Sequence, residues 1–281
     1  CTLGYEKMDG MIKRPQVFLY TLLILLAAIW LLPLYAMLTT SLKTPREVTA
    51  REFLTLPHRP NFANYVKALN SLGRGLINSM IISLPATALA VFIGSWGGYF
   101  LSMFKFKYAQ SIFFTTAIVT FLPYHIILIP FTQLMARLNL VNTYPGLILA
   151  YVILNAPTAA LITSTFFSKI PKELQEAAAL DGCGPVTFYW KILLPIALIG
   201  IAATAILVFT LIWNEFLLGV TLTQGSSVKP AMPVLAELKG TFVAQWHIQM
   251  AGAILTAIPP LLIFVFLGRY FVTGLIAGTL H

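Results

Sequence analysis

The feature that constrains this chain most is a series of apolar runs, each long enough to cross a lipid bilayer. The six runs lie at about residues 16–40, 77–103, 111–134, 145–167, 192–218 and 250–272. A helix needs about 20 apolar residues to cross the hydrocarbon core. Lipid offers no hydrogen-bond partner to the backbone, so a spanning segment is a helix or a strand of a closed barrel, and continuous runs of this length favour helices. We therefore expect an all-α integral membrane protein with six transmembrane helices in one bundle.

Composition supports a membrane protein and limits its partners. Of the 281 residues, 58% are hydrophobic and 10% are charged, whereas about a quarter of the residues of a soluble domain are charged. We expect an N-terminal segment, 1–15, with no removable signal peptide, and a transmembrane domain, 16–281. The net charge of +9 comes from basic residues scattered through the loops rather than gathered in a run or stripe. This pattern favours contact with membrane lipid and predicts no binding of nucleic acid.

Prolines and glycines predict how the helices pack. Eight prolines fall within or at the ends of the runs, at positions 33, 85, 123, 130, 157, 195, 259 and 260. Such breaks persist where neighbouring helices, hydroxyl side chains or water satisfy the freed carbonyls, so we expect bent helices in a tight bundle. The pairs Gly94/Gly98 and Gly274/Gly278 have the spacing of close helix contacts.

The basic residues give only a mild preference for orientation. An even number of spans places both termini on one side, and nine Lys and Arg residues then lie on each side of the membrane. Short loops weigh most in the positive-inside rule, and the tight turn at 105–107 carries two lysines. This turn favours cytoplasmic termini.

One polar stretch, ELQEAAALDGCGP at 173–185, interrupts the apolar pattern. Pro171 suits the first turn of a helix and Gly182 suits its end, so we predict a helix over 171–181. A narrow face of mostly small side chains recurs at steps of three and four residues: Ile170, Leu174, Ala177, Ala178 and Asp181. This face either docks into a groove on another protein or packs on the chain's own bundle.

The segment EAAALDGCGPVTFYWKILLP at 176–195 resembles the EAA motif of membrane subunits of binding-protein-dependent ABC importers. Further segments resemble the carbohydrate-uptake branch, in particular the second permease subunit related to the smaller maltose-importer membrane protein. They are PNFANYVKAL (60–69), YFLSMFKF (99–106), LIPFTQLMARLNLVNTYPGLIL (128–149), FFSKIPKEL (166–174), WNEFLLGVTLT (213–223) and RYFVTGLIAG (269–278). The resemblance covers nearly the whole chain. Cys183 and the ending TLH depart from it.

The resemblance implies a topology and a coupling site. It places the EAA loop, about 168–191, in the cytoplasm as a coupling helix between spans four and five, and both termini on the same side. The protein would be a multi-pass protein of a prokaryotic inner or cytoplasmic membrane. The residues implied to couple to an ATPase are Glu176, Ala177, Ala178, Asp181 and Gly182. The alanines would permit close approach, Glu176 would meet a basic group, and Gly182 would allow the chain to turn.

The resemblance also implies a set of partners. These are a second, homologous permease subunit in a heterodimer, two ATPase subunits and an extracytoplasmic solute-binding protein. The transported solute would be a sugar or a related compound, moved by alternating access, with a glycerol-phosphate-type solute as the alternative. The chain itself has no phosphate-binding loop, zinc-protease or nucleophile-elbow motif, so we expect no catalytic residue, cofactor or metal in it. ATP and Mg would be bound by the ATPase subunits.

Two other classes of function fit the residues less well. A secondary transporter is expected to have internal repeats and intramembrane charges, whereas Glu215 is the only acid placed within a span. A membrane-embedded enzyme needs clustered acids or histidines, and the four histidines are dispersed at 58, 125, 247 and 281.

Four residues are candidates for gating or for the solute pathway: Glu215, Asn214, Trp213 and His125. Glu215 lies near the outer end of span five. It contacts solute, takes part in gating or docking, or is a structural carboxylate held by Asn214 or a neighbouring helix. His125 lines the pathway or is a hydrogen-bonded core residue. Trp213 anchors the helix at the membrane interface or lines the pathway.

Overall fold

The computed structural model describes residues 5–50, 54–104, 106–225, 227–240 and 245–279. All regular secondary structure in these ranges is helical, as predicted. The chain divides into two compact units, residues 1–70 with 238–255 and residues 71–237 with 256–281. The helices α3 (Ala63–Met103) and α13 (Trp246–Thr279) each begin in unit 1 and continue in unit 2.

Unit 1 contains α1 (Tyr5–Ser41), α2 (Pro45–Thr49) and the beginnings of α3 and α13. The end of α1 is bound to the start of α3 by side chains of the PNFANY segment. Asn64 is buried, and its Nδ2 donates to the carbonyls of Ser41 and Lys43, both at 2.9 Å. The hydroxyls of Tyr65 and Ser41 lie 2.7 Å apart. The bond from Asn64 to Ser41 satisfies one of the carbonyl groups that a helix leaves unpaired at its C-terminus.

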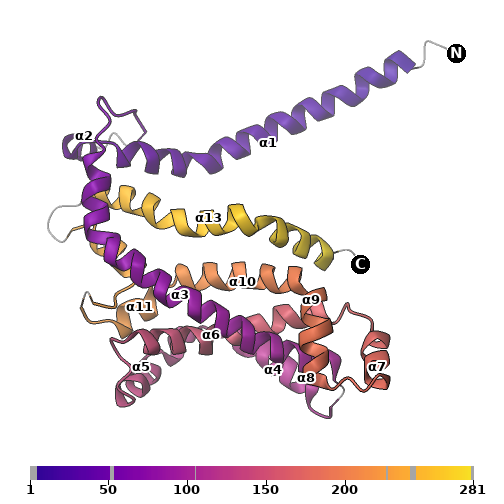
Figure 1. Cartoon of the computed structure of the whole chain (residues 1–281). Helices are drawn as coiled ribbons and strands as arrows, with labels where there is room; N and C mark the ends of the chain where they lie inside the picture. Colours follow the sequence, from indigo (N-terminus) through magenta and orange to yellow (C-terminus); the bar gives the residue numbers. More distant parts are fainter. Residues whose placement is uncertain (1–4, 51–53, 105, 226, 241–244, 280–281) are drawn as a thin grey trace. The chain divides into compact units, whose positions relative to one another are not determined.

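Unit 2 holds the remaining helices, with α6 (Tyr144–Phe167) packed against three of them (Figure 1). The three are α4 (Ala109–Phe121), α10 (Leu198–Trp213) and α11 (Leu217–Leu222). Buried residues of α6 and α10, among them Tyr151 and Val208, form its main core. The other elements are η1 (Tyr124–Ile127), α5 (Leu128–Arg137), α7 (Lys172–Leu180), α8 (Pro185–Phe188), the π-helix η2 (Tyr189–Leu193), α9 (Leu194–Ile196) and α12 (Ala231–Glu237).

The close packing predicted for Gly94 and Gly98 is confirmed. A Cβ added to Gly94 would lie 2.5 Å from the Cβ of Ala159, and one added to Gly98 would lie 2.4 Å from the hydroxyl oxygen of Thr163. Both positions therefore require glycine so that α3 can approach α6. Gly274 and Gly278 lie outside the residues whose surroundings the structure describes.

Four helical segments in the described ranges are long and apolar enough to cross a membrane, and two bent pairs raise the number to as many as six. The four are Gln16–Ser41, Ala63–Met103, Tyr144–Phe167 and Trp246–Gly268. The pairs are Ala109–Phe121 with Tyr124–Arg137, bent by 83°, and Pro185–Ile196 with Leu198–Trp213, bent by 81°. The bent helices expected from the prolines are therefore present.

Both bends have a local cause. Leu122 is extended, with ψ 132°, because a residue that precedes a proline is driven away from the helical region; this breaks the predicted third span at Pro123. The predicted fifth span, 192–218, changes direction at Ala197. This bend comes directly after Pro195 and the π-helical turn of η2, and both features bend helices.

Candidate functional site

The polar stretch forms α7, which matches the helix predicted over 171–181 to within one residue at each end. Pro171 is the N-cap rather than part of the first turn. At the other end, the N–H of Gly182 donates to the carbonyl of Ala179 at 3.0 Å, and that of Cys183 donates to the carbonyl of Ala178 at 2.9 Å. This pair of bonds is a Schellman motif. Gly182 has φ +78°, a backbone conformation that glycine adopts without strain.

The face of α7 that was predicted to dock is divided: Ala178 and Ile170 pack on unit 2 itself, whereas Leu174, Ala177 and Asp181 are exposed. Ala178 is buried in a cluster with Tyr99 and Phe167, and Ile170 packs at the edge of the same cluster. The small side chain of Ala178 permits close approach, as predicted, but the neighbour that it approaches belongs to this chain. Of the coupling residues, Ala178 therefore has a packing role.

The opposite face of α7 is exposed. It carries Glu173, Glu176, Ala177 and Leu180, which follow one another at steps of three and four residues. Leu180 is 90% exposed, although an apolar side chain of this size is usually buried. Asp181 and Gly182 are also exposed, directly after the helix. The sequence analysis did not single out Leu180. Its place in the series 173, 176, 177 and 180 indicates that it shares a helix face with the two glutamates.

A second site surrounds Glu215, between α10 and α11. Its carboxylate accepts hydrogen bonds from the backbone N–H groups of Leu217 at 2.9 Å, Leu218 at 3.0 Å and Gly219 at 3.2 Å. It also accepts from the hydroxyl of Tyr124 at 2.7 Å and from that of Tyr151 at 3.3 Å. The negative charge thus caps the N-terminus of α11.

Through the hydroxyls of the two tyrosines, Glu215 contacts two further helical elements. Tyr124 belongs to η1, directly after the break in the bent pair, and Tyr151 belongs to α6. One carboxylate therefore joins three elements, which is the arrangement of a structural residue. The group that holds it is not Asn214, because the Nδ2 of Asn214 donates to the carbonyl of Thr210 at 2.9 Å.

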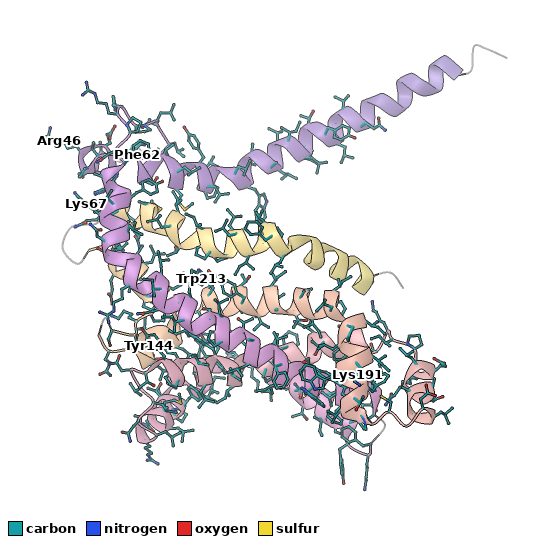
Figure 2. All side chains as sticks on the ribbon, viewed as in Figure 1. Arg46, Phe62, Lys67, Tyr144, Lys191 and Trp213 are labelled. Carbon is teal, nitrogen blue, oxygen red and sulfur yellow. The ribbon has the colours of Figure 1, made fainter. Side chains whose placement is uncertain are left out.

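The other two pathway candidates have contrasting surroundings. Trp213, labelled in Figure 2, is buried in unit 2, where its indole N–H donates to the carbonyl of Thr256 at 3.1 Å and its ring stacks on Phe209. His125 is exposed and stacks on Tyr124, with ring centroids 4.4 Å apart. The expectation of a core histidine at position 125 is therefore wrong, since η1 begins after the break at Pro123 and leaves this side chain outside the core.

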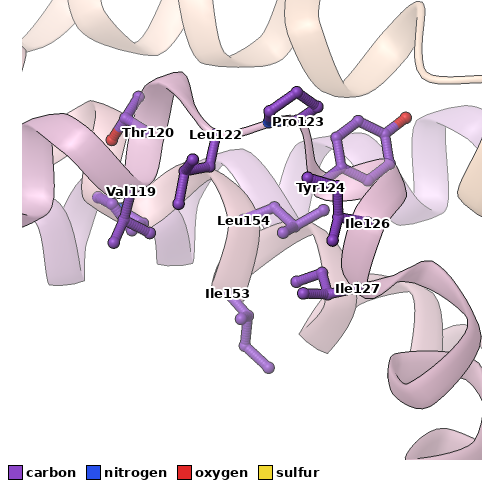
Figure 3. A pocket seen from close by; sticks show the side chains of 10 residues that line it. Val119, Thr120, Leu122, Pro123, Tyr124, Ile126, Ile127, Ile153 and Leu154 are labelled. Carbon is purple, nitrogen blue, oxygen red and sulfur yellow. The ribbon is translucent and has the colours of Figure 1, made fainter.

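An apolar cavity of about 310 Å³ lies beside the same break (Figure 3). Its lining includes Val119 at the end of α4, Pro123, Tyr124, and Ile153 and Leu154 of α6. Tyr124 thus contributes its ring to this cavity and its hydroxyl to Glu215. In the part of the chain that the structure describes, no three His, Cys, Asp or Glu residues are grouped to hold a metal ion.

Comparison with known proteins identifies the family. Residues 90–277 match the model of the binding-protein-dependent transport system inner membrane component. The glucose import system permease protein GlcU of Saccharolobus solfataricus is 34% identical over 279 residues, covering 97% of this chain and 96% of that protein. The sulfoquinovosyl glycerol transport system permease protein SmoH of Agrobacterium fabrum is 33% identical, covering 91% and 88%.

The fold is also that of a solved transporter. A chain in the crystal structure of a bacterial ABC transporter involved in the import of the acidic polysaccharide alginate superposes with a TM-score of 0.75 at 19% identity, covering 95% of this chain and 98% of that one. The family match extends over about two thirds of the sequence and includes α6, α7 and Glu215. This chain therefore belongs to the family of binding-protein-dependent transport system inner membrane components and is a permease subunit of an ABC transporter.

Proposed function

We propose that this subunit imports a sugar or a related solute by alternating access, with α7 as its docking element for an ATPase subunit. The observation that carries the proposal is the exposed face of α7. A helix of nine residues that presents one leucine at 90% exposure beside two glutamates has the chemistry of a short helix that inserts an apolar anchor into a groove rimmed by basic groups. Its other face holds it to unit 2 through Ala178.

The other subunits of the proposed assembly supply the ATP-binding sites for which this chain has no sequence motif. A second, homologous permease subunit completes the pathway as a heterodimer, two ATPase subunits bind ATP and Mg²⁺, and an extracytoplasmic binding protein delivers the solute. When the ATPase pair closes, each docked coupling helix moves with it, and the permease pair opens outward. In this arrangement α7, both termini and the turn at 104–110 face the cytoplasm, and six membrane spans are formed when each bent pair counts as one.

Replacement of Leu180 tests the docking role of α7. Because Leu180 contributes almost nothing to the packing of this chain, Leu180→Asp is expected to leave the amount of the permease pair unchanged and to lower ATPase recruitment at least about tenfold, the loss that removal of one buried leucine from an interface gives. Ala177→Trp, on the same face, is expected to act in the same direction. Recruitment is measured by pull-down of the ATPase with the purified permease pair.

The matched control is Leu56→Asp, since Leu56 is a 70% exposed leucine in unit 1, in the loop expected on the outside. It should leave recruitment unchanged. Full recruitment and full ATPase stimulation by the loaded binding protein in both α7 variants would show that α7 is a packed loop helix only.

The solute class rests on the relatives and needs its own test. GlcU is named for glucose import and SmoH for sulfoquinovosyl glycerol transport, which favours a sugar over a glycerol-phosphate-type solute. The cognate binding protein is titrated calorimetrically with a panel of mono-, di- and oligosaccharides, glycerol phosphate and its diesters. Uptake of the best ligand into proteoliposomes that hold the complete complex should require internal ATP. Binding of glycerol phosphates alone would replace the sugar assignment.

A further inference from the structure

We propose that Tyr99 and Ser95 on α3 are positioning residues that transmit movement of the α7–α8 loop to α3; this inference rests on the proposed docking role of α7. The loop returns towards the membrane through α8 and the π-helix η2, and these two segments are hydrogen-bonded to α3 at two points. Neither residue has a role in the sites described above, although Tyr99 lies in the cluster that buries Ala178.

The first contact joins Tyr99 to the start of α8. Tyr99 is fully buried, and its hydroxyl donates to the carbonyl of Pro185 at 3.2 Å. Pro185 is the first residue of α8, three positions after Gly182. A hydroxyl on α3 thus holds the backbone at the point where the chain leaves the turn of the coupling loop.

The second contact joins Ser95 to η2. The hydroxyls of Ser95 and Tyr189 lie 2.6 Å apart in a buried environment, and the Ser95 hydroxyl lies 2.9 Å from the carbonyl of Phe92. Serine has a single hydroxyl proton. Because the Phe92 carbonyl can only accept, Ser95 donates to it, and the Tyr189 hydroxyl donates to Ser95.

Stacked rings fill the space between these contacts. Trp96 stacks on Tyr189 with ring centroids 4.3 Å apart, and Tyr99 stacks on Phe188 at 6.2 Å. Buried aromatic rings in close contact resist sliding because interiors are close-packed. The two hydrogen bonds and the ring stack, taken together, make one face of α3 and the α8–η2 segment move as a unit.

The direction of transmission follows from the backbone. After η2 the chain bends by 81° before α10, so a push along α8 is poorly transmitted along the chain itself. In contrast, α3 (41 residues) continues as one helix from these contacts, through Pro85, to Ala63. We therefore infer that movement of α7 reaches the membrane-spanning region first through α3 rather than through α10.

Hydroxyl deletions test the inference. Tyr99→Phe and Ser95→Ala keep the ring stack and the helix while each removes one inter-helix hydrogen bond. Each is expected to lower the number of solute molecules imported per ATP hydrolysed by about two- to tenfold, the factor that corresponds to loss of one net hydrogen bond. ATPase recruitment is expected to stay at the wild-type level. Ser95→Ala combined with Tyr189→Phe should be no worse than either single variant, because both remove the same bond.

The matched control is Ser102→Ala. Ser102 lies on the same helix and its hydroxyl bonds only to the α3 carbonyls of Gly98 and Tyr99 in the contacts that the structure describes, so its removal should leave the import per ATP unchanged. An unchanged ratio in the double variant Tyr99→Phe/Ser95→Ala would overturn the inference, and so would loss of recruitment, which would show that the bonds only fold the loop. Failure of the proposed function would have a different result from failure of this inference. The wild-type complex itself would then show no ATPase recruitment or no ATP-dependent uptake.

Discussion

At the scale of single residues, Glu215 is the position where geometry changes the expectation most. A carboxylate that accepts from three backbone N–H groups and two tyrosine hydroxyls cannot be replaced by an amide without placing an N–H₂ group against donors. Glu215→Gln is therefore expected to destabilise the complex by about 2 kcal/mol, since hydrogen bonds to a charged group contribute about 1.5–3 kcal/mol. The measurement is the midpoint of thermal unfolding of the purified complex.

Variants of the partners refine this prediction. Tyr124→Phe removes the shorter of the two tyrosine contacts and should cost about 1 kcal/mol. Asn214→Ala is the control, because this exposed side chain bonds to its own helix, and it should change stability by less than about 0.5 kcal/mol. If Glu215→Gln unfolded at the wild-type temperature while uptake fell, a direct role of the charge in gating or solute contact would replace the structural role.

The hydrogen bonds of Glu47 predict that the local stability of unit 1 depends on pH. Its carboxylate accepts from the backbone N–H of Thr44 at 2.7 Å and from that of His58 at 2.9 Å. These two bonds, with those from the side chains of the same residues, lower the pKa of Glu47 from 4.5 to about 2. Because the pKa is depressed on folding, the contribution to stability is fully present above pH 4.5 and is lost as the pH falls towards 2.

Hydrogen exchange measures this contribution. The amides of Thr44 and His58 are expected to lose protection between pH 4.5 and pH 2 in the wild type, after correction for the intrinsic exchange rate. In Glu47→Gln they should be less protected already at pH 7 and should show no such transition. A transition at the same pH in both proteins would assign the effect to another group.

At the scale of elements, the turn after α7 shows how backbone conformation limits substitution. An added Cβ meets nothing within 4 Å at either Gly182 or Gly184, but only Gly182 has a positive φ, whereas Gly184 has φ −71°. Gly182→Ala is thus expected to destabilise the end of α7 by about 1–2 kcal/mol, and Gly184→Ala, which adds the same methyl group, is the matched control with little effect. Exchange of the Cys183 and Gly182 amides reports the difference. Equal effects of the two variants would contradict the backbone explanation.

The same elements show what the sequence predicts well. The apolar runs locate the helices because lipid-length hydrophobicity needs no tertiary information, and the cap signals place α7 to within one residue. The directions of the helices are less predictable. Prolines indicate where bends are possible, but eight prolines lie in or at the ends of the runs, and their positions alone do not tell which of them turn the chain by 83° or 81°. The division into two units was also not expected from the runs.

The faces of the elements were harder to predict than their ends. On α7, Ala177 and Ala178 are adjacent alanines with the same composition signal, yet Ala178 is buried and Ala177 is exposed. Only the aromatic cluster around Tyr99, to which α3, α6, α8 and η2 contribute, decides which face is covered. The donors to Glu215 likewise lie 64 and 91 residues away at Tyr151 and Tyr124, a separation that no local pattern reveals.

At the scale of the whole molecule, the exposed apolar surface of this chain must be covered by lipid or by another protein subunit. In unit 1, none of the apolar window of α1 is buried, and in unit 2 no residue of α4 is buried. Lipid is sufficient to cover α1. Beside α4, however, lies a cavity lined by Val119 and Pro123, and the helix carries hydroxyl groups at Ser111, Thr115 and Thr116. Polar groups on a membrane helix usually face protein or water. We therefore expect the exposed surface of α4 to contact the second permease subunit.

This expectation yields the last prediction. The chain expressed alone should reach the membrane without giving ATP-dependent uptake, and co-expression with its homologous partner and the ATPase should restore uptake. A cysteine placed at Thr115 on α4 should cross-link to the partner subunit, whereas one placed at Ile24, on the unburied face of α1, should not. An active importer built from this polypeptide and the ATPase without a second permease would replace the heterodimer with two copies of this chain. Equal cross-linking at both positions would show that α4 is not the specific contact face, because a helix surrounded by lipid meets its neighbours at random.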